Sequence, residues 1–173
     1  MSDETEQLTE ARADFIAQWG TLGPVWGITR SMAQIHAALL ATEEPLSTDE
    51  LMELLEISRG NANTHLRELV SWGLARPVHR KGDRKEYFEA EKSVWAIFCI
   101  IARERRRREI DPALAALRDC VAKTKGLRTR ESKAFHGMVA ELADFVGTAN
   151  RILERAAARQ ESHVIPALLK LFR

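Results

Sequence analysis

One stretch of the chain, residues 47–90, constrains the fold more than any other part. It reads STDELMELLEISRGNANTHLRELVSWGLARPVHRKGDRKEYFEA, with two short amphipathic segments, a Trp-Gly-Leu stop and two strand-like segments around a basic tip. Ser47 or Thr48 can cap the first segment as a helix, because their hydroxyls accept from free N–H groups at a helix start. Asp49 and Glu50 place negative charge in the first turn, where the helix dipole favours it. These signals predict a helix, a turn, a second helix and a hairpin.

The first of the two predicted helices is amphipathic and acidic. Leu51, Leu54 and Leu55 form one apolar stripe at helical spacing. Every charged residue in the range 43–56 is acidic. Because carboxylates and phosphates repel each other, we do not expect this helix to lie along a nucleic acid.

The second predicted helix begins after Ser58, a good N-cap residue. Ala62, Leu66 and Leu69 follow at positions i, i+4 and i+7, so they should face the core. Ala62 is small, which suits close approach of two helices at the turn. Gly73 can supply the left-handed position that ends the helix.

The remaining faces of this helix carry side chains that can bind base edges or phosphates. They are Ser58, Arg59, Asn61, Asn63, Thr64 and Arg67. Asparagine can contact adenine at two points, arginine can do the same to guanine, and threonine can contact a base or a thymine methyl group. The N-terminal half of a recognition helix is the part that reaches the bases. We therefore expect Asn61, Asn63, Thr64 and Arg67 to read bases or to position the helix.

A basic hairpin follows, with predicted strands at 74–79 and 86–90 and a Gly82-Asp83 turn between them. Pro77 confines the first strand to a sheet edge or a strand start, and Leu46 is expected to pair briefly with these strands. The tip carries Arg80, Lys81, Arg84 and Lys85. Between residues 57 and 88 there are seven basic and three acidic residues, a balance of +4, whereas the whole chain is only +1. Together with Arg59, the four tip residues are expected to hold the phosphate backbone or the minor groove.

This ordered set is typical of the winged helix-turn-helix fold, in which a recognition helix and a β-wing contact double-stranded DNA. The expected fold class is mainly α with a small β-wing, a winged helix-turn-helix core flanked by N- and C-terminal dimerisation helices. The predicted function is a sequence-specific DNA-binding regulator. The alternative is a winged-helix protein-docking module without specific DNA binding, since such units also serve as interaction surfaces.

The N-terminal region, residues 1–42, is expected to support the core or dimerise. Residues 1–6 are expected to be disordered and 8–19 helical, with a break at 20–24. Pro24 can open a second helix that runs to about residue 42. The apolar residues are Leu8, Phe15, Ile16 and Trp19 in the first helix, and Val25, Ile28, Met32, Ile35 and Leu39 in the second.

The C-terminal region, residues 93–173, is expected to follow the winged region at 43–92 and to dimerise. Ser93 caps a helix whose first half is apolar almost all round and should be buried. That apolar half holds Val94, Trp95, Ile97, Phe98, Ile100 and Ile101. The run Arg105–Arg108 is interpreted as a solvated, salt-bridged face. Asp111-Pro112 predicts a kink or restart, after which the helix continues to Lys125.

A further helix is expected after Thr129, with a near-heptad apolar stripe, and a last short helix at 163–172. The stripe consists of Phe135, Met138, Val139, Leu142, Phe145, Val146, Ala149, Ile152, Leu153 and Ala156. It offers more apolar surface than one winged domain needs. A second copy of the chain is the simplest cover, and a two-fold dimer suits palindromic DNA. Packing within the monomer is the alternative.

The segment from Trp19 to Pro112 resembles the GbsR-type branch of the MarR superfamily. The resemblance is carried by Trp19-Gly20 with Gly23-Pro24, by SRGNANTHLRELVSWGL, by the Gly82-Asp83-Arg84-Lys85 wing and by RREIDP at residues 107–112. It implies a homodimeric winged-helix regulator, usually a repressor, that contacts DNA through recognition helix and wing. Regulators of this branch control glycine betaine synthesis or uptake and respond to choline.

An effector site can be placed on four aromatic residues. Trp19, Trp26, Trp95 and Phe98 could converge into a cage for a quaternary ammonium group. The alternative is that they are ordinary core residues, which is the commoner fate of aromatics at helical spacing.

No catalytic, metal or cofactor site is expected. The sequence has no Gly-rich phosphate loop or nucleophile elbow, and its five histidines lack metal-ligand spacing. The N-terminus is polar and no apolar run is long enough to cross a membrane, so a cytoplasmic protein is expected. Cys99 and Cys120 lie in apolar helical settings that predict reduced thiols, with a redox role as the alternative.

Overall fold

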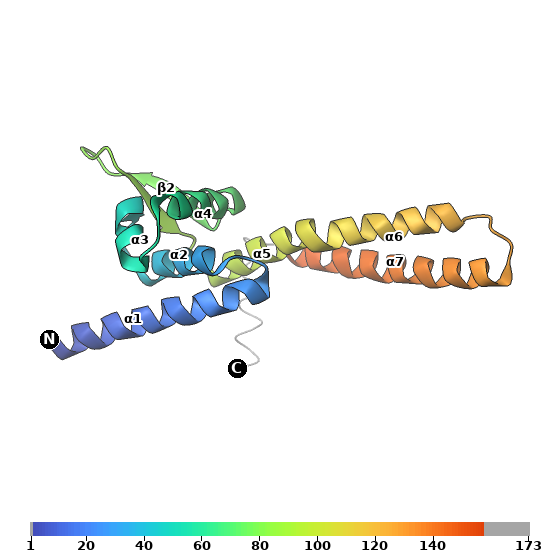
Figure 1. Ribbon diagram of the computed structural model, residues 1–173, viewed down its shortest axis with the longest axis horizontal. Helices are drawn as coiled ribbons and strands as arrows, with labels where there is room; N and C mark the ends of the chain where they lie inside the picture. Colours follow the sequence, from blue (N-terminus) through green and yellow to red (C-terminus); the bar gives the residue numbers. More distant parts are fainter. Residues whose placement is uncertain (1, 158–173) are drawn as a thin grey trace. The chain divides into compact units, whose positions relative to one another are not determined.

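The computed structural model describes residues 2–157 (Figure 1). The chain divides into two compact units, Met1–Ile97 and Phe98–Arg173, which are taken separately below. The helix expected at 163–172 lies outside the described residues.

The first unit holds three helices and a small sheet in the order expected for a winged helix. The helices are α2 (Arg30–Ala41), α3 (Thr48–Leu55) and α4 (Arg59–Trp72). The strands are β1 (Leu46–Ser47), β2 (Ala75–His79) and β3 (Glu86–Ala90), which form an antiparallel sheet in the order β1-β3-β2. The mainly helical fold with a small β-wing is therefore confirmed, and the β2–β3 hairpin projects beyond α3 and α4 (Figure 1).

The strand predictions are confirmed in detail. Leu46 pairs with Phe88, so the short strand before α3 joins the wing. Pro77 lies opposite Phe88 on β2, which is an edge of the sheet. An edge strand tolerates proline because the missing N–H leaves no partner unsatisfied.

Local capping fixes the helix-turn-helix. Ser47 and Glu50 form a reciprocal capping box at the start of α3: the Ser47 N–H donates to Glu50 Oε2 at 2.6 Å, and the Glu50 N–H donates to Ser47 Oγ at 3.3 Å. Glu56 ends α3 in the left-handed region, with φ of 52°. Ser58 caps α4, and Gly73 ends it at φ of 86°, as predicted.

The core of the first unit lies where α2, α3, α4 and the sheet meet. Its fully buried side chains include Met32, Ile35, Leu39, Leu51, Leu66, Leu69 and Leu74. Ala62 is buried as predicted. Leu54 is 54% exposed, so its place in the predicted core stripe is wrong. The reason is that α3 is only eight residues long and buries a narrow face centred on Leu51.

The N-terminal helix is longer than predicted. α1 runs over Ser2–Leu22 and packs against α2, so the expected disorder is wrong for residues 2–6. The predicted break at 20–24 is confirmed, because α1 ends at Leu22. Gly20 does not break the helix because it lies against α2: a Cβ there would come within 2.5 Å of Gln34 Cγ. Gly20 therefore permits close approach of two helices, and Ile16 is buried one turn earlier.

Pro24 opens only one turn, the 3₁₀ helix η1 (Gly23–Trp26). Gly27 ends that turn at φ of 78°, and Thr29 then caps α2 by accepting from the Met32 N–H at 3.1 Å. The predicted helix from Pro24 to residue 42 is thus two elements, because Gly27 takes up a conformation that a helix cannot continue. Val25 is exposed on η1 and does not join the core stripe.

Helix α5 (Val94–Arg105) crosses the boundary between the two units. Ser93 caps it, as predicted, and accepts from the Ala96 N–H at 3.3 Å. The expectation that its first half is buried all round is wrong, since Val94 is 81% exposed and Phe98 is also exposed. Burial is confined to one face, which carries Ala96, Cys99 and Ile100.

A new α-helix begins at Asp111 with Pro112 in its first turn, so the predicted restart is confirmed. A π-helical turn, η2 (Arg106–Ile110), joins α5 directly to α6 (Asp111–Thr124), and the Asp111 N–H donates to the Arg106 carbonyl. A proline ring clashes with the carbonyl four residues before it. The π turn includes Arg108, whose carbonyl lies four residues before the proline.

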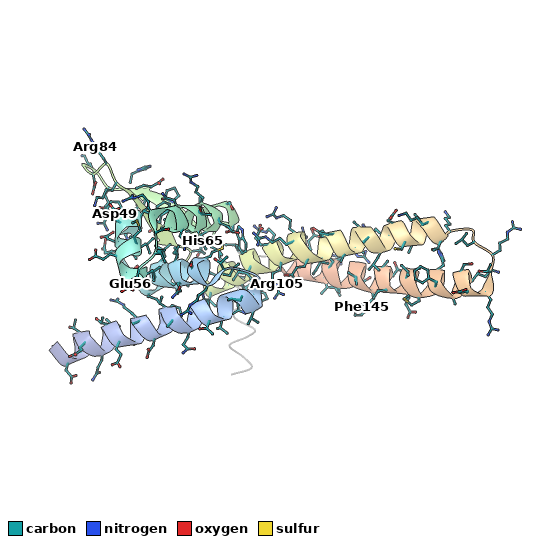
Figure 2. All side chains as sticks on the ribbon, in the orientation of Figure 1. Asp49, Glu56, His65, Arg84, Arg105 and Phe145 are labelled. Carbon is teal, nitrogen blue, oxygen red and sulfur yellow. The ribbon has the colours of Figure 1, made fainter. Side chains whose placement is uncertain are left out.

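The second unit is a helical hairpin of α6 and α7 (Arg130–Ala157). Gly126 turns the chain at φ of 89°, and Thr129 caps α7 by accepting from the Ser132 N–H at 3.1 Å. Leu114 and Val139 are buried. Much of the predicted apolar stripe is left uncovered: Phe135, Met138, Leu142, Phe145 and Ile152 are exposed. The side chains at positions 153 and 156, also placed in that stripe, lie outside those described. Figure 2 shows Phe145 on the side of α7 turned away from α6.

Candidate nucleic-acid interface

Helix α4 presents a polar surface next to the wing. Asn63 is half-buried and Arg67 exposed, and within residues 2–157 neither side chain has a hydrogen-bond or ion-pair partner. Ser58 is exposed, but its hydroxyl is engaged as the helix cap and accepts from the Asn61 N–H at 3.3 Å. Asn63 and Arg67 are therefore the side chains of α4 best placed to reach a ligand.

Two residues of α4 bond to α2. Asn61 Nδ2 donates to Ser31 Oγ at 3.4 Å, and Thr29 Oγ1 lies 3.1 Å from His65 Nε2 (His65 is labelled in Figure 2). Thr64 is exposed, and its Oγ1 donates to the Gly60 carbonyl within α4 at 2.9 Å. Asn61 thus joins α4 to α2.

The wing ends in a rigid turn with a basic tip. Gly82 has φ of 88°, and Asp83 accepts from the Lys85 N–H at 2.9 Å and from the Tyr87 hydroxyl at 2.7 Å. These hydrogen bonds, the backbone one first, lower the pKa of Asp83. The one carboxylate of the tip is therefore used inside the turn. Arg84 lies at the tip (Figure 2), and within residues 2–157 neither Arg84 nor Lys81 is paired.

Arg80, at the start of the wing turn, is held by three contacts. Its guanidinium donates to Glu44 Oε2 at 3.1 Å and to the Pro45 carbonyl at 3.2 Å. Its Cζ lies 4.2 Å from the centre of the Tyr87 ring, a cation–π contact. Arg80 is thus fixed along the hairpin rather than free in solvent.

Asp49 joins the start of α4 to the wing. Its carboxylate pairs with the Arg59 guanidinium, and its Oδ2 lies 3.5 Å from Lys85 Nζ. The hydrogen bond and charge of Arg59, followed by those of Lys85, lower the pKa of Asp49. These two cations, both predicted to hold the DNA backbone, therefore share one carboxylate.

Sequence reasoning missed Asp49, Glu44 and Tyr87 as members of this surface. Asp49 looked like an ordinary N-terminal acid of α3, and its partners lie 10 and 36 residues later. Glu44 and Arg80 are likewise 36 residues apart. The only hint in the sequence was the concentration of acid before residue 57 and of base after it.

The arginine run belongs to the second unit and is salt-bridged. Arg105 pairs with Glu109 at 3.2 Å, and Arg107 pairs with Glu104 at 2.7 Å. Arg106 pairs with Glu154 at 2.7 Å and lies 3.8 Å from Asp111. The interpretation of this run as a salt-bridged face is confirmed for these three residues.

Two of the four aromatics predicted to form a ligand cage are in contact. The rings of Trp19 and Trp26 meet edge to face at 4.9 Å between centroids, and Phe15 adds a tilted contact with Trp19 at 5.4 Å. Trp95 is half-buried on α5, and Phe98 lies in the second unit. The structure thus brings Trp19 and Trp26 together in the first unit.

Three further kinds of site were considered in the sequence: reactive cysteines, metal ligands and membrane-spanning helices. Cys99 is buried and free, and burial raises its thiol pKa, which disfavours the reactive thiolate; Cys120 is free and half-buried. Among residues 2–157, no three His, Cys, Asp or Glu side chains gather as a metal site. No helix in that range combines the length and apolar character needed to span a membrane.

Comparison with known proteins finds similar chains. The HTH-type transcriptional repressor GbsR of Bacillus subtilis (strain 168) is 25% identical over 126 residues, which is 73% of this chain and 68% of that protein. A solved structure described as a transcriptional regulator is 22% identical, with a TM-score of 0.65 over 87% of this chain and 98% of its own. Apo wild-type MarR from E. coli is 14% identical, with a TM-score of 0.38 over 82% of this chain and 96% of its own. No protein-family model matches the chain. The winged-helix fold and the resemblance to GbsR-type regulators are confirmed.

Proposed function

We propose that this winged-helix chain, which resembles GbsR-type regulators of the MarR superfamily, is a cytoplasmic, dimeric transcriptional repressor that binds specific double-stranded DNA. The proposal names α4 as the recognition helix and the β2–β3 hairpin as the wing. Asn63 and Arg67 read bases, with Thr64 offering its methyl group, while Ser58 and Asn61 position the helix. Arg59, Arg80, Lys81, Arg84 and Lys85 hold phosphates or the minor groove.

One observation supports this proposal above the others: Arg67 and Asn63 on α4 and Lys81 and Arg84 on the wing lie in the same unit, and none of the four has a partner among residues 2–157. Base contacts supply specificity, and phosphate contacts supply orientation and most of the non-specific affinity. A surface with both kinds of group is suited to duplex DNA. A docking module would have no need for unpaired cations at the tip of a projecting hairpin.

The test is fluorescence anisotropy of a labelled duplex taken from upstream of the gene for this chain. Titrations at several salt concentrations, with and without random competitor DNA, separate specific from electrostatic binding. Competitor-resistant binding with a steep salt dependence is expected. If the chain binds no duplex, even at low salt, the proposal is wrong and the docking alternative replaces it.

The dimer part of the proposal rests on the uncovered face of α7. Five large apolar side chains of this helix are exposed, and Phe145 is 72% exposed. A self-complementary apolar face suits a second copy of the chain, and two-fold symmetry matches palindromic half-sites. We expect sedimentation velocity to give a dimer. Phe145→Glu should shift it to monomer, whereas Lys133→Glu at an exposed polar position of α7 should not; a monomeric wild type at tens of micromolar would contradict this part.

The effector part rests on the paired rings of Trp19 and Trp26. Aromatic faces hold quaternary ammonium groups by cation–π attraction, worth about 0.5–2 kcal/mol per contact. Calorimetric titration with choline and with betaine tests this directly. Heat that disappears in Trp26→Ala supports an effector site here, and the absence of heat at millimolar ligand contradicts it.

A further inference from the structure

Asp49 bridges α4 and the wing, the two elements proposed to face DNA. It sits in the first turn of α3, and its two carboxylate oxygens pair with Arg59 at the start of α4 and with Lys85 on the wing. Figure 2 shows Asp49 near the base of the hairpin whose tip carries Arg84. Ser47, Thr48 and Glu86 complete the shallow depression around these three side chains. One carboxylate therefore pairs with a cation from each element.

The contacts of Asp49 are open to solvent and so can be exchanged. The side chains of Arg59 and Lys85 are 62% and 57% exposed, and that of Asp49 is 45% exposed. Ion pairs at this exposure contribute little to stability. A phosphate that approaches the same face can therefore replace the carboxylate without disrupting the fold.

Whether a phosphate does so depends on how long it stays. In a complex with random DNA the protein shifts between positions, so each phosphate contact at Arg59 or Lys85 is short-lived. The carboxylate is attached to the same chain and recovers both cations between contacts. At an operator, base contacts favour one position on the duplex, so the phosphates opposite Arg59 and Lys85 stay in place. The Asp49 carboxylate therefore weakens the phosphate contacts of Arg59 and Lys85 in the random complex more than in the specific complex.

We propose that Asp49 is a specificity-determining residue, an intramolecular competitor that withholds Arg59 and Lys85 from the phosphates of random DNA. This inference rests on the proposed DNA-binding function. It gives the acidic helix α3 a role in discrimination although it does not contact bases. Glu44, which pairs with Arg80 at 3.1 Å, is a weaker second instance, because Arg80 is also held by Tyr87 and by the Pro45 carbonyl.

The test compares the salt dependence of binding to two duplexes, the tightest duplex selected from a random-sequence pool and a scrambled duplex of equal length. Each phosphate contact adds about 0.9 to the slope of log affinity against log salt. Asp49→Asn should steepen the slope on the scrambled duplex by about one to two units. It should also tighten binding to that duplex about three- to tenfold at low salt. On the selected duplex, slope and affinity should stay within about twofold of wild type.

Matched variants separate this role from simple charge and from folding. Glu53→Gln removes the same charge from an exposed, unpaired position of α3 and should leave both slopes unchanged. Asp49→Glu keeps the carboxylate and should restore wild-type discrimination. In an Arg59→Ala, Lys85→Ala background, Asp49→Asn should have no further effect. Thermal unfolding of each variant verifies that the fold is intact.

Three results would overturn the inference. Equal steepening on both duplexes would make Asp49 a general competitor, and loss of affinity for the selected duplex would make it a clamp that positions Arg59. Unchanged slopes on both would leave its ion pairs without a role in binding. In each case the wild type still binds DNA and the proposed function stands. If the wild type shows no salt-dependent binding at all, the proposed function fails and this inference fails with it.

Discussion

The ammonium nitrogen of Lys92 lies 2.7 Å from the carbonyl oxygen of Leu39, in the last turn of α2. It also donates to the carbonyls of Leu40 at 3.1 Å and Thr42 at 2.6 Å. The last carbonyls of a helix have no partner within the helix, and the dipole makes that end negative. A single side chain from the segment after β3 therefore satisfies the end of α2 and fixes the wing to it. Desolvation lowers the pKa of Lys92.

Lys92→Met should destabilise the protein by about 1–2 kcal/mol, since it keeps the aliphatic chain and removes a charged donor. Urea unfolding at neutral pH measures the loss. Lys81→Met at the wing tip changes the same charge at an exposed position without a described partner, so it should leave stability within about 0.5 kcal/mol of wild type. Equal losses in the two variants would mean that the three carbonyl bonds of Lys92 contribute nothing.

His36 gives the protein an acid-sensitive core. It is buried on α2, and its Nε2 has no hydrogen-bond partner among the described residues. Burial, assisted by the charge of Lys92, lowers the pKa of His36 from 6.5 to about 4. The folded protein therefore holds a neutral imidazole at a pH where the unfolded chain already binds a proton.

This difference in protonation makes the free energy of unfolding depend on pH. Between pH 6.5 and about 4 the unfolded state binds more protons at this site, so the free energy of unfolding falls as the pH falls. The shift corresponds to roughly 3 kcal/mol as an upper bound. His36→Gln should flatten this part of the stability curve, whereas His79→Gln on the exposed edge strand should retain it. A decline of the same size in His36→Gln would remove His36 from this role.

Features with a local physical cause could be predicted from the sequence. Ser58 caps α4, Gly73 ends it and Pro77 lies on an edge strand because each effect depends on the backbone within a few residues. The apolar spacing of Leu66 and Leu69 was equally reliable, since α4 packs on one face. The winged core and its exposed polar surface follow from such signals.

Features that depend on distant neighbours could not be predicted. Gly20 is typical of a helix break in the sequence, but it lies within α1 because α2 packs against it. Val94 looked buried because its neighbours in sequence are apolar, although it lies on an open side of α5. The ion pair of Asp49 with Arg59 depends on how α3 and α4 are juxtaposed, which spacing alone does not give.

Glu56, which ends α3 (labelled in Figure 2), has a left-handed backbone conformation with φ of 52° and ψ of 40°. This conformation favours glycine, which has no Cβ. The left-handed region costs a residue with a Cβ about 1 kcal/mol. Glu56→Gly should therefore stabilise the helix-turn-helix by about 0.5–1 kcal/mol in urea unfolding. Glu53→Gly, inside α3, should instead destabilise it by about 1 kcal/mol. Destabilisation by both changes would show that the Glu56 side chain contributes more than its backbone strain costs.

Arg84 lies at the tip of the wing and has no described partner, so its charge is available to phosphates. Arg84→Ala should weaken binding to every duplex by a similar factor and reduce the salt slope by about one unit. Anisotropy titrations on a selected and a scrambled duplex measure both quantities. Arg76→Ala is the control, because that arginine is paired with Glu89 across the sheet at 2.5 Å. An unchanged slope in Arg84→Ala would remove the wing tip from the interface.

Substitution of Asn63 should distinguish sequence specificity from general affinity for DNA. Its amide has no described partner, and it lies in the N-terminal half of α4, where base edges come within reach. A good bidentate contact of an amide with adenine discriminates against the wrong base by about 1–3 kcal/mol. Asn63→Ala should therefore weaken binding to the selected duplex about tenfold and change binding to the scrambled duplex little, with the salt slope unchanged. Asn61→Ala is the informative comparison, because Asn61 bonds to Ser31 and its loss should lower stability as well as binding. Equal losses on both duplexes in Asn63→Ala would contradict a base-reading role, since a residue that only holds phosphate or supports the helix cannot tell the two sequences apart.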